Sequence, residues 1–91
     1  MGSQELPRIW FSTNDRVAID RYGLWLPKSK ADLERLGSEL REGLRVMLYE
    51  PGELEMEATL AFDPDYKAWI ATGDGTTILY APGSGGEHLN P

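Results

Sequence analysis

The chain has 91 residues, which fits one domain, with 41% hydrophobic and 26% charged residues, an ordinary globular balance. The absence of cysteine excludes disulfides, thiolate metal sites and thiol catalysis. A net charge of −6 opposes binding to nucleic acid and to anionic membranes. Because the sequence also shows no secretory signal and no apolar run near the ~18 residues of a membrane span, we expect a cytoplasmic protein without membrane contact.

A first strand is predicted over residues 8–12. Ile9 and Phe11 fall on one face of such a strand and Trp10 falls on the other, because successive side chains point to opposite faces. If the first two face the core, Trp10 faces solvent. Residues 13–15 then supply the asparagine and aspartate that favour a turn.

Residues 16–26 predict a second strand or a pair of strands. The apolar residues on the two sides of Gly23 have opposite parity and would fall on opposite faces of one regular strand. A β-bulge near Gly23 would return both sets to one face, and a tight turn over residues 20–23 is the alternative. We favour the bulge.

A short helix is expected next, with residues 30–36 as its best-defined part. Leu33 and Leu36 recur there at helical spacing. Ser29 is predicted to cap the helix by accepting a hydrogen bond from a free backbone N–H. Gly37 either ends the helix in a left-handed conformation or lies inside a longer helix.

Residues 45–72 predict an antiparallel meander whose middle strand is the most regular in the chain. Apolar side chains occupy every second position of this strand, which places them on one face. The meander strands and the last strand of the chain are predicted over residues 45–50, 53–63, 66–72 and 76–81. The apolar face of the middle strand comprises Leu54, Met56, Ala58, Leu60 and Phe62.

About six short strands and one short helix predict a mainly β (α+β) fold, in the form of a small antiparallel barrel or a curled sheet. The meander resembles the core of SH3-like barrels. This resemblance implies a fold and no function, because no family motif accompanies it. We predict a flexible arm over residues 1–7, one compact domain over residues 8–82 and a flexible glycine-rich tail over residues 83–91.

The other face of the middle strand carries an acidic row, defined as Glu53, Glu55 and Glu57, with neighbours about 6.8 Å apart. Residues 50–74 hold seven acidic side chains and one basic side chain, that of Lys67. Their net charge of −6 equals the net charge of the whole chain. One interpretation is a solvated face that discourages pairing between sheet edges. The other is a ridge that docks on a basic protein.

The first third of the chain has the opposite charge. Cations interleave there with aromatic residues, a pattern with which small barrels hold single-stranded nucleic acid. The competing interpretation is that the aromatic side chains form the core and the cations solvate its rim. Attraction between the basic and acidic halves would give a weak homodimer, and without it we expect a monomer. The candidate nucleic-acid-binding residues are Arg8, Arg16, Arg21, Lys28 and Lys30.

Trp10 and Trp25 are the best single candidates for contact with a partner protein. Parity places each of them opposite the apolar residues of its own strand. Tryptophan is enriched among the residues that dominate interface energetics. Core packing is the competing interpretation for both.

Motifs for catalysis or metal binding are weak. Residues 73–77 resemble a phosphate-binding loop, but they lack its lysine and join two strands. Residues 63–65 resemble the start of a calcium loop, but the required glycine and final acidic residue do not follow. His88 is the only histidine and lies in the glycine-rich tail. We therefore predict no cofactor, no metal site and no enzyme activity.

These features favour a small acidic non-catalytic module that binds another protein, in one concrete form an immunity-type or antitoxin-type inhibitor of a basic partner. A nucleic-acid-binding module that uses the N-terminal cations is the alternative. The predicted partner-binding residues are Glu53, Glu55, Glu57, Trp10 and Trp25.

Overall fold

Stretches of β-branched and aromatic residues alternate with glycine, proline and aspartate along the chain, and residues 5–80 fold into seven strands and one α-helix. The computed structural model describes residues 5–80, so the predicted tail and most of the predicted arm lie outside the described residues. The strands are β1 (Arg8–Trp10), β2 (Arg16–Ala18), β3 (Arg21–Gly23), β4 (Arg45–Glu50), β5 (Leu54–Asp63), β6 (Ala68–Gly73) and β7 (Leu79–Tyr80). The helix is α1 (Pro27–Leu36), and three 3-10 turns cover Thr13–Asp15, Gly37–Glu39 and Gly75–Thr77.

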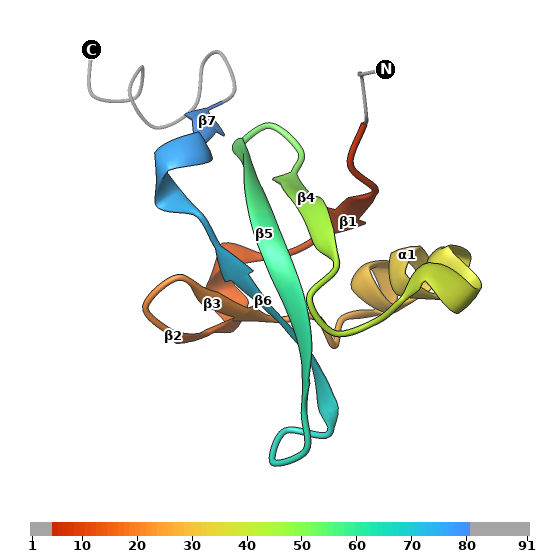
Figure 1. Ribbon diagram of the computed structural model, residues 1–91. Helices are drawn as coiled ribbons and strands as arrows, with labels where there is room; N and C mark the ends of the chain where they lie inside the picture. Colours follow the sequence, from red (N-terminus) through yellow and green to blue (C-terminus); the bar gives the residue numbers. More distant parts are fainter. Residues whose placement is uncertain (1–4, 81–91) are drawn as a thin grey trace, which may run out of the picture.

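The strands form one mixed sheet in the order β1-β4-β5-β6-β3-β2, and β7 pairs with the first part of β5. β1 runs parallel to β4, because the chain passes through β2, β3 and α1 before it returns in the same direction. Figure 1 shows the long β5 in the middle of the molecule, between α1 and the β2–β3 hairpin. The predicted mainly β fold with one short helix is confirmed, but the prediction of a purely antiparallel arrangement is wrong.

The strand pairings do not close the sheet. β1 and β2 lie at its two ends and do not pair with each other within the described residues. The predicted barrel is therefore not confirmed, and residues 5–80 form an open sheet.

The hydrophobic core covers one face of the sheet. In β5, Met56, Ala58 and Leu60 are buried as their alternation predicts. Phe62 was expected on the same buried face but is 44% exposed, because it lies beyond the core and packs edge-on against Trp69, with ring centres 5.7 Å apart. The core comprises Ile9, Phe11, Leu24, Leu33, Val46, Leu48, Met56, Ala58, Leu60 and Ala71.

Helix α1 begins earlier than predicted and covers the free edge of β1. Pro27 occupies its first turn, where a backbone N–H would have no hydrogen-bond partner within the helix, so proline costs no helical hydrogen bond. The predicted cap is wrong: Ser29 is buried in the helix, and its hydroxyl donates to the carbonyl of Trp10 at 2.6 Å. The buried carboxylate of Asp32 accepts a hydrogen bond from the N–H of Trp10 at 2.9 Å. The helix ends at Gly37, which has a φ of +56°.

The bulge predicted near Gly23 is wrong. The chain reverses at Ile19 and Asp20 instead, so that Ala18 faces Arg21 across a tight hairpin. Asp20 has a φ of +61°, a left-handed conformation that aspartate tolerates better than most residues. The register irregularity lies within β2 rather than at the glycine.

Turn residues decide where the C-terminal strands begin and end. The turn predicted at residues 51–52 is present, with Gly52 at a φ of +78°. The last strand, predicted over residues 76–81, is shorter in the structure. Because the side chain of Asp74 accepts from the backbone N–H of Thr76, a 3-10 turn forms first and only β7 remains extended.

Candidate protein-binding surface

A pocket of about 170 Å³ lies where β4, β5 and β7 meet, beside the turn at residues 51–52. β5 places the residues of both neighbouring strands, because Tyr49 of β4 and Leu79 of β7 are each paired with Glu55. We call this site the hairpin pocket. Besides the turn, it is lined by Tyr49, Glu50, Leu54, Glu55, Leu79 and Tyr80.

Two neighbouring apolar side chains of the hairpin pocket are open to solvent. Leu79 and Tyr80 are each 68% exposed. As successive residues of a strand they point to opposite faces, so Leu79 shares the face of Glu55 and Tyr80 shares the face of Leu54. Ile19 is more exposed, at 78%, but it lies at the tip of the β2–β3 hairpin and lines no part of this pocket. β7 therefore carries exposed apolar surface on both faces.

Arg8 ties the acidic row to the N-terminal strand. Its guanidinium donates to the carboxylate of Glu55 at 2.8 Å and lies 4.6 Å from the ring centre of Tyr49. The hydrogen bond to Glu55 raises the pKa of Arg8. A residue predicted to bind nucleic acid and a residue predicted to bind a protein therefore neutralise each other on one face of the sheet.

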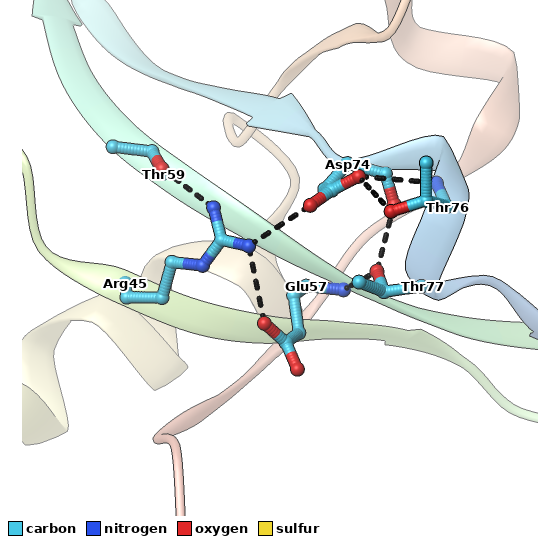
Figure 2. A network of polar contacts seen from close by, with 6 residues as sticks. All are labelled: Arg45, Glu57, Thr59, Asp74, Thr76 and Thr77. Carbon is cyan, nitrogen blue, oxygen red and sulfur yellow. Dashed lines mark hydrogen bonds and ion pairs between the residues drawn. The ribbon is translucent and has the colours of Figure 1, made fainter.

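Glu57 belongs to a polar network centred on Arg45 (Figure 2). The Arg45 guanidinium donates to Glu57 at 3.1 Å, to Asp74 at 3.2 Å and to Thr59 at 3.1 Å. The bonds to the two carboxylates raise the pKa of Arg45. Hydrogen bonds from the hydroxyl and N–H of Thr76, followed by the bond from Arg45, lower the pKa of Asp74.

The same network holds the segment that leads into β7 against β5. The N–H of Glu57 donates to the hydroxyl of Thr77 at 2.9 Å, and the N–H of Asp74 donates to the carbonyl of Glu57 at 2.8 Å. These bonds take the place of strand pairing at this point of β5. The network therefore has a structural role, because it sets where Leu79 and Tyr80 lie.

The acidic row is not a ridge of three free charges. Glu55 and Glu57 are half-buried and paired with arginines, as described above. Glu53 is exposed in the turn before β5, and its side chain forms no ion pair within residues 5–80. Glu50 lies at the other end of the same turn and lines the hairpin pocket. The free negative charge of the row is thus found beside this pocket.

The two predicted anchor tryptophans lie elsewhere. Trp10 is half-buried, its backbone is bonded to α1, and the ammonium of Lys28 lies 5.8 Å from its ring centre. Trp25 is half-buried over Gly23, where an added Cβ would come within 2.0 Å of the indole, and its ring centre is 5.8 Å from that of Tyr66. Neither tryptophan lines the hairpin pocket.

The five predicted nucleic-acid-binding cations are spread over several elements. Arg8 is paired as described, and Arg21 lies 3.5 Å from Asp63. Arg16 and Arg21 belong to the β2–β3 hairpin, whereas the two predicted lysines belong to α1, on the other side of β5 in Figure 1. The described residues therefore do not gather these side chains into one basic patch.

A second, more open hollow of about 210 Å³ lies between α1 and β6. Its apolar lining comes from Leu33, Leu40 and Trp69, and Lys30 and Glu34, which have opposite charges, also line it.

Sequence reasoning did not identify Tyr49, Leu79 or Tyr80 as site residues. The sequence does predict strands at these positions from β-forming residues, but periodicity cannot tell an edge strand from an internal one. The exposure of Leu79 and Tyr80 depends on β7 lying outside β5, which is a property of the strand order.

Within residues 5–80, no three histidine, cysteine or acidic side chains are placed to hold a metal ion, and His88 lies outside this range. No helix of the described part is long and apolar enough to cross a membrane. No protein-family model, no curated protein and no solved structure matches this chain.

Proposed function

We propose that this protein is a non-catalytic module that binds a basic partner protein through the hairpin pocket. The observation that carries the proposal is the exposure of Leu79 and Tyr80, each 68%, beside an apolar pocket with carboxylates around it. Contiguous exposed apolar surface with a polar rim is typical of interaction sites. The aromatic and leucine side chains would supply the buried centre of the interface and the glutamates its rim.

Charge defines the kind of partner. Glu50, Glu53 and Glu55 surround or adjoin the pocket, and Arg8 is the one cation bonded to any of them within the described residues. A partner with lysine or arginine beside an apolar anchor complements this arrangement and would be drawn to it over a longer range. An inhibitor that covers a basic toxin, of the immunity or antitoxin type, is one concrete form of this function.

Nucleic-acid binding has less support. Two of the five candidate cations are engaged with carboxylates, and the five are divided among β1, the β2–β3 hairpin and α1. A groove that tracks a phosphate backbone needs its cations along one surface. The net charge of −6 adds to the repulsion of a polyanion.

The test uses the full chain as bait in an extract of the source cells, with captured proteins identified by mass spectrometry. Each captured protein is then purified and titrated calorimetrically against the wild type and against the double variant Leu79→Ser/Tyr80→Ser. We expect the double variant to bind at least about tenfold more weakly, because two exposed apolar anchors are lost. The control is Ile19→Ser, which removes the most exposed apolar side chain outside the pocket.

Equal affinity of the wild type and the double variant for every purified partner would contradict the proposal. Nuclease treatment of the extract gives a further check. A partner whose capture depends on intact nucleic acid would support the alternative function instead.

A further inference from the structure

The position of β7 limits what can cover its two exposed side chains. Its residues pair with β5 on one side, Leu79 with Glu55 and Tyr80 with Leu54. On its other side no strand pairs with β7 within residues 5–80, so β7 is an edge strand of the described sheet. Its outward backbone groups are those that an added strand would use.

Leu79 and Tyr80 point to opposite faces of the sheet, yet both line the hairpin pocket. An extended chain beside β7 can cover both. Its own side chains alternate between the two faces, and its backbone bonds to the open edge. Exposed apolar residues on both faces of an edge therefore favour a strand as the ligand.

We infer that the partner contributes an extended basic segment, with two successive apolar residues flanked by lysine or arginine, which adds to the sheet as a strand beside β7. This inference rests on the proposed function and specifies its binding mode. The apolar side chains of the segment pack against Leu79 and Tyr80, and its cations meet the carboxylates of Glu50 and Glu53.

A second copy of this chain is the other strand that could occupy the edge. A second copy would carry the same net charge of −6 as the first. Two molecules with the same net charge repel each other. Charge complementarity therefore selects a basic segment over a second copy.

The test uses a short synthetic peptide in which pairs of valines alternate with pairs of lysines, and a matched peptide with the same charge but N-methyl groups on alternate residues. N-methylation removes the backbone donors that a strand needs and leaves the side chains unchanged. We expect the first peptide to shift the NMR amide signals of Leu79 and Tyr80 in the ¹⁵N-labelled full chain. We expect the methylated peptide to bind at least about tenfold more weakly.

Charge is tested with two variants that change the net charge equally. Glu53→Lys alters the turn beside the hairpin pocket, and Glu34→Lys alters the exposed side of α1. The inference predicts weaker peptide binding for Glu53→Lys and unchanged binding for Glu34→Lys. If both variants lost the same peptide affinity, the peptide would respond to net charge alone, and this result would overturn the inference.

Other results would also overturn the inference. These are equal binding of the two peptides, no binding of either, or amide shifts confined to α1 or β2. A dimer in sedimentation experiments that is lost in Leu79→Ser/Tyr80→Ser would assign the edge to a second copy. The proposed function fails separately, when a purified natural partner binds that double variant as well as it binds the wild type.

Discussion

Arg8 of β1 and Glu55 of β5 form an ion pair, 2.8 Å between nitrogen and oxygen, that spans the intervening strand β4. The guanidinium crosses above the ring of Tyr49 to reach the carboxylate. The basic first third of the chain and its acidic middle thus meet within one molecule. The pair also neutralises part of the negative charge of the hairpin pocket.

Replacing Arg8 by glutamine should separate stability from binding. The pair is solvent-exposed, so the free energy of unfolding should fall by at most about 1 kcal/mol, measured by chemical denaturation. Affinity for the lysine–valine peptide should rise, because the Glu55 carboxylate then has no arginine beside it. Arg41→Gln changes net charge equally in an exposed loop and should leave the affinity unchanged. A fall in affinity for Arg8→Gln would contradict this role.

The buried carboxylate that covers the edge of β1 should matter more for stability. Asp32→Ala leaves the N–H of Trp10 without its partner, which should lower the free energy of unfolding by about 1–3 kcal/mol. Glu34→Ala, an exposed change in the same helix, should stay within about 0.5 kcal/mol of wild type. Similar denaturation midpoints for the two variants would show that α1 docks without this bond.

Gly23 should be intolerant of a side chain. A Cβ there would lie 2.0 Å from the indole of Trp25, so Gly23→Ala must displace the ring and should cost about 1–3 kcal/mol. Gly75→Ala is the control, since nothing lies within 4 Å of its added Cβ. Tryptophan fluorescence should shift in the first variant alone. An unchanged spectrum and stability for Gly23→Ala would contradict the observed stacking.

The Asp74 carboxyl should titrate below the ordinary aspartate range. Because its pKa is lower in the folded state, it stabilises the fold above its unfolded pKa of about 3.9, and this contribution disappears as the pH falls through the folded value. A ¹³C NMR titration should show the low pKa in wild type. Thr76→Val should raise it, because the largest cause of the shift is the Thr76 hydroxyl bond. Thr72→Val, on β6, should leave it unchanged.

Local sequence determined much of the secondary structure. Alternation in β5 follows from side-chain geometry, and Gly37 and Gly52 end or turn the chain because glycine adopts positive φ without strain. The aromatic and aliphatic residues that form the core were recognisable from the same patterns. Each of these features depends on interactions between residues close together in the chain, which a sequence displays directly.

The tertiary structure alone decided the site. Ser29 looks like a cap in sequence but bonds to Trp10, a residue that is distant in the chain. Glu55 and Glu57 look like free charges until β1 and β4 bring arginines beside them. The exposure of Leu79 and Tyr80 requires β7 to lie at the edge of β5. Strand order and cross-strand pairing arise from contacts between distant segments, and no local pattern of residues encodes which segments will meet.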